Sequence, residues 1–252
     1  MMPMQKKRKT VSWTTIVLLM LCSGCAAVHG YHPDDPWESW NRGVQSFNDD
    51  VDAYMIKPVA VRYEAVMPSF AHHAVTNFFS NIDDIGVSIN DALQGKYRQS
   101  AMDTARLLVN TTAGAGGLID VGSMISLPKH YEDFEQTLGW WGVYSGPYLV
   151  LPLFGSSSPR GVAGLLGDAA MNPVSYTGIY FNGSVLTALA VSGGAAAVNT
   201  IDTRANSLML EKVINEAAID RYQFLKNAYW QRRDYLLHDG NVPDADVLNF
   251  QE

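Results

Sequence analysis

The chain is predicted to fold as one all-α domain. Apolar residues recur at helical spacing in several segments, and the alternating β-branched runs of a sheet are scarce. The chain has 252 residues, of which 47% are hydrophobic, so it can bury a substantial core. Charged residues make up only 17%, against about 25% in ordinary globular domains. This low charge argues against a disordered chain.

The first 24 residues are predicted to be an export signal. Four basic residues at 6–9 precede an apolar stretch from Val11 to Cys22, and the small residues Ser23 and Gly24 follow. The apolar stretch is shorter than the roughly 20 residues that a membrane span needs. Residues 1–24 are therefore expected to be removed.

Cys22 and Cys25 are the only cysteines of the chain, so the mature protein has no disulfide. The segment Leu21-Cys-Ser-Gly-Cys25 resembles the lipobox of bacterial lipoproteins, although Cys22 stands where leucine is usual. This resemblance implies cleavage before Cys25 and attachment of lipid to it. An ordinary secretory signal, cleaved nearby and leaving a free thiol at Cys25, fits the same residues. Ala26 follows the cysteine, which in lipoproteins implies delivery to the outer membrane.

The mature chain is more acidic than the whole. Residues 1–24 carry four basic and no acidic side chains, so their removal changes the net charge from -7 to -11. An acidic protein does not attract nucleic acid or anionic lipid headgroups by overall charge. No nucleic-acid partner is expected, and contact with lipid must come from apolar surface.

Residues 25–37 are predicted to be a flexible tether, followed by a helical domain over 38–240. The tether contains His29, Gly30, Pro33 and Pro36, which favour an extended chain. A polar helix is expected from Asn41 to Tyr54, ending before Pro58. Its polar side chains would either line a water-filled passage or form an ordinary solvated face.

Two further helices have clear boundaries. Phe78, Ile82, Ile85, Ile89 and Leu93 follow one another at spacings of 4, 3, 4 and 4, and Gly95 is expected to end this helix.

A capping-box pattern at Ser100–Asp103 predicts that the next helix starts there and continues to about Asn110. The glycines Gly114, Gly116 and Gly117 then form a turn. They follow a helix rather than a strand, which argues against a dinucleotide site.

A long central region is nearly free of charge. Only Arg160 and Asp168 carry charge between Gln136 and Ile201. Repeated glycines and prolines prevent either half from crossing a membrane as one helix. Short helices could lie within one leaflet or be buried against each other. Ser184 to Asn199 is one such helix, about 24 Å long, which is also compatible with a buried core helix.

Aromatic residues cluster at the start of this region. Trp140, Trp141, Tyr144 and Tyr148 precede the apolar segment 149–154. Aromatic side chains with a polar edge favour the membrane interface, although core packing is the alternative.

Charge returns near the C-terminus. After Asp202, residues 203–237 are predicted to form one long helix with a buried face, and residues 241–252 a loose tail.

No pattern predicts catalysis, a metal or a cofactor. The only Gly-Lys pair is followed by Tyr97 rather than the Ser or Thr of a phosphate-binding loop. The six histidines lack zinc-site spacing, and no Gly-x-Ser-x-Gly elbow occurs. A Ser/His/Asp triad assembled from distant residues would leave no such pattern. The protein is therefore predicted not to be an enzyme.

Five ordered motifs resemble the MlaA/VacJ family of outer-membrane phospholipid-transport lipoproteins. They cover nearly all of the mature chain and lie at 47–60, 105–121, 132–143, 146–155 and 220–233. They include Phe47-Asn-Asp-Asp-Val, Ala113-Gly-Ala-Gly-Gly-Leu-Ile-Asp120 and Gly146-Pro-Tyr-Leu-Val-Leu-Pro. Glu135 stands where the family usually has glycine, and Arg160-Gly161 replaces a common Arg-Asp pair.

The resemblance implies a ring-like helical body in the inner leaflet of the outer membrane, pierced by an amphipathic channel. Such proteins remove phospholipid misplaced in the outer leaflet and pass it to a soluble periplasmic carrier. A porin trimer holds them, and an inner-membrane ATP-driven complex accepts the lipid downstream. The expected location is the periplasmic side of the outer membrane. We expect the channel to involve Asn41, Phe47, Asn48, Asp49, Asp52, Gly114, Gly116 and Gly117.

Two other functions compete with this one. A structural lipoprotein could scaffold porins without moving lipid. An envelope phospholipase or esterase would instead release fatty acid and depend on one serine.

Overall fold

The computed structural model describes residues 35–176 and 185–242, which are mostly helical. The elements are, in chain order, α2 (Glu38–Val51), η1 (Asp52–Ile56), α3 (Lys57–Val66), α4 (Ser69–Leu93), α5 (Tyr97–Thr112), α6 (Val121–Met124), α7 (Phe134–Trp140), β1 (Leu149–Leu151), β2 (Gly155–Ser157), α8 (Pro159–Met171), η2 (Pro173–Tyr176), α10 (Val185–Asn206), α11 (Leu208–Ala217) and α12 (Arg221–Leu237). The prediction of a predominantly helical fold is confirmed. The strands are short and form one antiparallel hairpin, with Val150 opposite Ser156.

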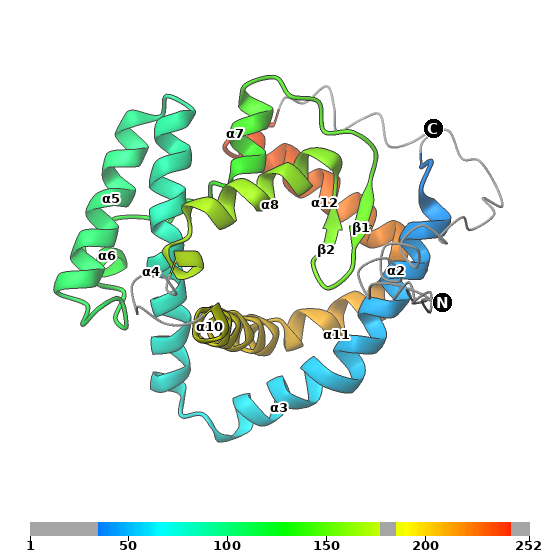
Figure 1. Cartoon of the computed structure of the whole chain (residues 1–252), viewed down its shortest axis with the longest axis horizontal. Coiled ribbons are helices and arrows are strands. Elements are labelled where there is room, and N and C mark those ends of the chain that lie inside the picture. Colours follow the sequence, from blue (N-terminus) through cyan, green and yellow to red (C-terminus); the bar gives the residue numbers. More distant parts are fainter. Residues whose placement is uncertain (1–34, 177–184, 243–252) are drawn as a thin grey trace, which may run out of the picture.

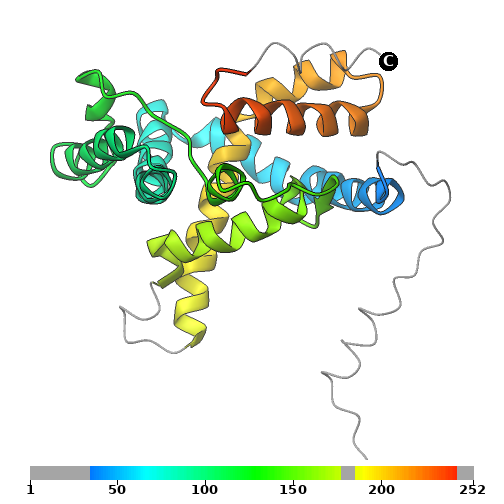
Figure 2. The same ribbon diagram turned by 90° about the horizontal axis from the view of Figure 1, so that it is seen from above.

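The helices follow one another around a ring (Figure 1). α2 and α3 form one part of it, α4 crosses the opposite side with α5 outside, and α8, the hairpin and α12 complete the circuit. α10 is seen end-on in this view because it runs across the plane of the ring. From above, α11 and α12 lie on one side of this plane and the start of α10 projects on the other (Figure 2).

The helix that contains Phe78–Leu93 is confirmed, and Gly95 follows it at a φ of +78°. Only glycine adopts such a conformation readily, which explains the stop. The predicted start of the next helix at Ser100 is wrong, because α5 begins three residues earlier. The Ser100 hydroxyl instead donates to the carbonyl oxygen of Ser88 at 2.8 Å and so joins α5 to α4.

The expected break before Pro58 is absent. α2 continues into α3 through η1, a π-helical segment in which the Lys57 amide donates to the carbonyl oxygen of Asp52. Proline lacks an amide proton and normally disrupts a helix interior. The wider π turn shifts the local hydrogen bonds and allows the chain to pass Pro58 as a helix.

The single long helix expected over 203–237 is also wrong. The chain bends after Asn206 and again before Arg221, giving α11 and α12. Asp220 caps α12 by accepting hydrogen bonds from the amides of Tyr222 and Gln223. The helix start at Asp220 divides the predicted helix into two antiparallel helices (Figure 2).

A small core lies where α2, β1 and α12 meet. It contains Val44, Val150 and three tyrosines: Tyr148, Tyr222 and Tyr229. Tyr148 is 2% exposed, and its ring contacts those of both other tyrosines with centroids less than 6 Å apart. The membrane-interface prediction is therefore wrong for Tyr148, and core packing is the correct alternative.

Asn41 joins the same three elements. Its amide nitrogen donates to the Tyr148 carbonyl oxygen at 2.9 Å, and its amide oxygen accepts from the Val150 amide at 2.8 Å. Asp35 accepts hydrogen bonds from the Tyr222 hydroxyl and the Lys226 ammonium nearby. Because Asp35 is buried in this way, the body begins before the predicted end of the tether at residue 37.

No helix among the described residues is long and apolar enough to cross a membrane.

Candidate functional site

Two clefts lie beside α10. The first, which we call the paired cleft, has a volume of about 350 Å³ and lies between α2, the tip of the β1–β2 hairpin and α11. Its charged side chains are Asp49, Asp52, Arg204, Glu211 and Arg221, and its apolar lining includes Leu153, Phe154 and Ile214.

Every carboxylate of the paired cleft has a basic partner. The Arg204 guanidinium donates to both oxygens of Asp52, at 2.7 and 2.8 Å, and to Glu211 at 2.5 Å. Glu211 also accepts from the Lys57 ammonium at 2.9 Å. The hydrogen bond from Arg204 lowers the pKa of Glu211 to about 2. This network links η1 and α3 to α10 and α11.

Three of the predicted channel residues line the paired cleft. Asp52 bonds to Arg204, and Asp49 lies 3.4 Å from a guanidinium nitrogen of Arg221. The Asn48 amide donates to the Leu151 carbonyl oxygen and accepts from the Leu153 amide, which fixes the hairpin tip. Phe47, from the same helix, is exposed outside the lining.

The second cleft, which we call the acidic cleft, has a volume of about 550 Å³. It lies between α4, the segment before α7, the end of α8 and α10. Five carboxylates line it, together with one basic side chain, Lys129; the carboxylates are Asp83, Glu132, Asp133, Asp168 and Asp202. Among the described residues, no group of His, Cys, Asp and Glu side chains is arranged to hold a metal ion.

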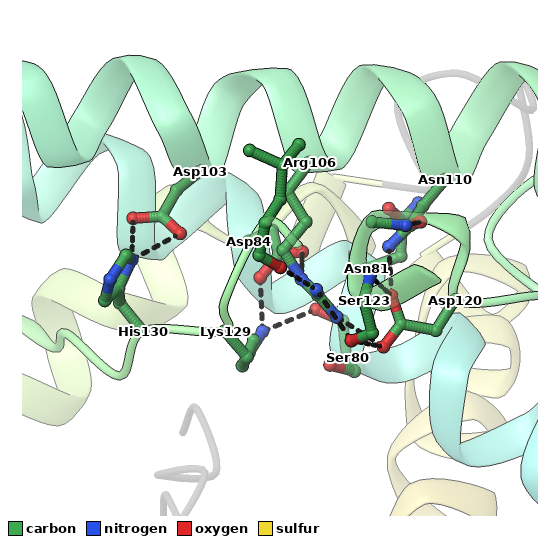
Figure 3. Close-up of polar contacts among 12 residues, drawn as sticks. Ser80, Asn81, Asp84, Asp103, Arg106, Asn110, Asp120, Ser123, Lys129 and His130 are labelled. Atoms are coloured by element: carbon green, nitrogen blue, oxygen red, sulfur yellow. Dashed lines mark hydrogen bonds and ion pairs between the residues drawn. The ribbon is translucent and has the colours of Figure 1, made fainter. Parts of the chain in front are cut away.

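A polar network holds the wall of the acidic cleft in place (Figure 3). Lys129 donates to the Ser80 carbonyl oxygen at 2.9 Å and pairs with Asp84, which is fully buried on α4. Arg106 of α5 lies 2.7 Å from Asp120 and 3.4 Å from Asp84. Burial alone would raise the pKa of Asp120, but hydrogen bonds from Ser123 and Arg106 outweigh it and lower that pKa to about 2.

The net pKa shift is opposite in two other carboxyl groups, for which burial dominates. Burial raises the pKa of Asp168 to about 6, although the Phe134 amide donates to this carboxylate at 2.8 Å. Asp91, behind the cleft on α4, has its pKa raised to about 8 by burial and by the neighbouring acids Asp103 and Glu132. The acidic side of the ring therefore holds carboxyl groups that resist ionisation.

The remaining predicted channel residues lie elsewhere. Asn41 is fully buried in the core, so its prediction as a channel residue is wrong. A methyl group added at Gly114 would meet the backbone oxygens of Asn110 and Ile119 at less than 2.5 Å, and Gly117 packs against Asn81. With Gly116, which like Gly117 has a positive φ, they form the predicted turn at the end of α5 and line neither cleft.

Three of the predicted interface aromatics are exposed. Trp140, Trp141 and Tyr144 are more than half exposed, and their place at a membrane interface stays a prediction. Cys25 lies outside the described residues.

Sequence reasoning missed several residues of both clefts. Arg204 and Glu211 belong to the charge-rich C-terminal segment, and no local spacing connects them to Asp52. Asp168 was visible as an interruption of the charge-free region. Asp202 was visible as the end of that region, whereas Asp83 had no such signal.

The family model for the MlaA lipoprotein matches residues 33–236. The chain belongs to the MlaA lipoprotein family. One relative is the intermembrane phospholipid transport system lipoprotein MlaA of Escherichia coli K12, which is 34% identical over 222 residues, or 86% of this chain and 84% of the relative. The protein of the same description from Shigella flexneri is 33% identical over the same shares.

A solved structure shares the fold of this MlaA-family chain. It comes from work on the "Structural basis for maintenance of bacterial outer membrane lipid asymmetry". The TM-score is 0.65 at 32% sequence identity, and the match covers 81% of this chain and 98% of the other. The similarity therefore extends over the ring and not only over the motifs.

Proposed function

We propose that the protein removes phospholipid misplaced in the outer leaflet of the outer membrane and passes it towards the periplasm. The observation that carries this proposal is a helical ring with polar clefts beside a helix that runs across its plane. The similarity to MlaA lipoproteins named for intermembrane phospholipid transport supports it. Both clefts combine charged and apolar lining, which suits a molecule with a polar head and apolar tails.

The ring is proposed to sit in the inner leaflet of the outer membrane, on the periplasmic side, anchored by lipid on Cys25. Large apolar side chains at the hairpin tip and on α8 support this placement, because Leu153, Phe154 and Leu166 are each about 70% exposed. The exposed Trp140, Trp141 and Tyr144 fit the level of the headgroups.

The partners belong to the same proposal. A porin trimer would hold the ring in the membrane, a soluble periplasmic carrier would accept the lipid, and an ATP-driven inner-membrane complex would act downstream. These partners follow from the family resemblance. The descriptions of the relatives, which name an intermembrane phospholipid transport system, support them.

No covalent step is part of the proposal. Two serines before α8 have structural roles: Ser156 of β2 bonds to the Tyr148 hydroxyl, and Ser158 caps α8 by accepting from the Gly161 amide.

The test is the amount of outer-leaflet phospholipid in cells that lack the protein. Phospholipid accessible to an externally added phospholipase would be measured in intact deletion cells carrying wild type, Cys25→Ala or no protein. We expect accumulation in the deletion strain, reversed by wild type and not by Cys25→Ala. Unchanged outer-leaflet phospholipid in the deletion strain would favour the porin scaffold. Fatty-acid release by the purified protein, lost on replacing one serine, would favour the lipase.

A further inference from the structure

The acidic cleft adjoins a second cavity. This cavity of about 390 Å³ shares Phe79, Ile82, Asp83, Asn172 and Asn199 with it. The rest of that cavity is lined mainly by small and apolar residues of η2 and α10, including Val174, Gly193 and Ala196. Four of the five carboxylates therefore lie in the acidic cleft alone, whereas the adjoining cavity, which we call the apolar extension, has Asp83 as its only carboxylate among the described residues.

Among the described residues, the acidic cleft is lined by more acidic than basic side chains. Glu132 pairs with Lys96 and Asp133 with Arg233, while Asp202 accepts hydrogen bonds from the hydroxyls of Tyr63 and Thr76. Lys129 is the only basic residue in the described lining, and it is already paired with Asp84. Asp83 and Asp168, from α4 and α8, form no ion pair among residues 35–176 and 185–242.

Gln136 adds an independent observation. Its side chain lines the acidic cleft and the residue is only 3% exposed. Its amide nitrogen donates to the Tyr131 carbonyl oxygen at 3.1 Å, but its amide oxygen accepts no hydrogen bond from the described residues. A buried acceptor without a donor is costly, and a ligand with N–H groups would satisfy it.

We propose that the acidic cleft receives the primary ammonium group of an ethanolamine headgroup, with an acyl chain in the apolar extension. This inference rests on the proposed function and specifies its substrate class. A primary ammonium offers three N–H donors to carboxylates and to an amide oxygen. A glycerol headgroup leaves the phosphate charge uncompensated, so an anionic phospholipid meets repulsion from Asp83 and Asp168.

The test compares phospholipids that differ only in headgroup. Purified protein in non-ionic detergent at low salt would be titrated with phosphatidylethanolamine, phosphatidylglycerol and phosphatidylcholine that carry the same fluorescent acyl chain. We expect the ethanolamine lipid to bind about fivefold more tightly than the other two, the size of one partly screened charge interaction. The double variant Asp83→Asn/Asp168→Asn is expected to bring the ethanolamine-to-glycerol ratio close to one.

A matched control is Glu64→Gln. Glu64 is an exposed acid on α3 that lines neither cleft, so its replacement removes a charge without changing the proposed site. Circular dichroism would verify that each variant is folded.

The outcomes separate the two proposals. Equal binding of ethanolamine and glycerol lipids, or a ratio unchanged in the folded double variant, overturns the headgroup inference and leaves phospholipid transport standing. Choline lipid binding as tightly as ethanolamine lipid overturns the role of the N–H donors. Binding of none of the three lipids contradicts the proposed function and the inference with it.

Discussion

The paired cleft and the acidic cleft share α10 but use charge in opposite ways. Arg204 lines the paired cleft and Asp202 lines the acidic cleft. Residues two positions apart on an α-helix point in directions about 200° apart. In the paired cleft, each carboxylate lies beside a guanidinium or ammonium group. In the acidic cleft, Asp83 and Asp168 form no ion pair among the described residues. The first arrangement joins helices, whereas the second leaves charge facing a cavity.

The contrast separates structural charges from charges suited to a ligand. Salt bridges between η1, α3, α10 and α11 close the ring where the chain passes through its π-helical segment. Unpaired carboxylates cannot contribute stability in this way, and a raised pKa in a cleft is typical of functional positions. The two clefts should therefore respond differently to mutation and to pH.

The largest effect on folding is expected from Arg204→Met. This change leaves Asp52 and Glu211 facing each other without the guanidinium, and the three side chains are only 14–29% exposed. We expect the free energy of unfolding to fall by about 2 kcal/mol, below the full cost of breaking a buried pair. Urea unfolding would measure it. Arg204→Lys, which keeps the charge without the two-pronged geometry, should lose less. A wild-type midpoint for Arg204→Met would mean that the network does not hold the ring together.

The next effect concerns Asp168 and has the opposite sign. Its pKa is raised from 3.8 to about 6 in the folded protein, so the folded state binds the extra proton between these pH values. Stability should therefore fall as the pH rises from about 4 to 6. Asp168→Asn keeps an oxygen for the Phe134 amide and should remove this dependence.

We expect Asp168→Asn to raise the free energy of unfolding by about 1 kcal/mol at pH 7, a value reduced for partial exposure. Thermal unfolding from pH 4 to 8 would measure both quantities. A variant less stable than wild type at pH 7 would show that the negative charge of Asp168 is itself stabilising.

Lys57→Met tests the outer part of the paired network and should have a smaller effect. Lys57 is 42% exposed and bonds to Glu211, which keeps its contact with Arg204. We expect a loss of about 0.5 kcal/mol.

The pH dependence of the Lys57 pair should mirror that of Asp168. Because the pKa of Glu211 is lowered from 4.5 to about 2, the stability from its pairing is present above pH 4.5 and disappears as the pH falls towards 2. The difference between wild type and Lys57→Met should therefore shrink in acid. A difference that persists at pH 2 would point to packing of the lysine stem instead.

The sequence predicted what depends on neighbouring residues. Apolar spacing placed the helix that ends near Gly95, and the turn at Gly116 and Gly117 follows from glycine conformation. The break in the predicted helix over 203–237 was missed because no glycine or proline interrupts these residues. The helix was wrongly expected to end before Pro58, because no local sequence pattern indicates the π turn that lets the helix continue.

Long-range polar contacts limited the prediction of the site. Asn48, Asp49 and Asp52 were recognised as a polar helix face, and the structure places them beside a cleft. The same pattern included Asn41, whose amide bonds to a strand more than 100 residues away. Periodicity tells which residues share a face but not which ones another element covers.

The smallest effect on folding, and the sharpest test of the contrast, is expected from Asp83→Asn. Asp83 is exposed within the acidic cleft and has no hydrogen-bond or ion-pair partner in the described parts of the chain. We expect the free energy of unfolding to change by less than about 0.5 kcal/mol, as for an ordinary surface substitution. Urea unfolding beside Glu64→Gln would measure it. If the Asp83 carboxylate serves ligand binding, Asp83→Asn should leave stability unchanged and should weaken the preference for an ethanolamine headgroup. A loss as large as that of Arg204→Met would instead make Asp83 a structural charge, and the distinction between the two clefts would fail.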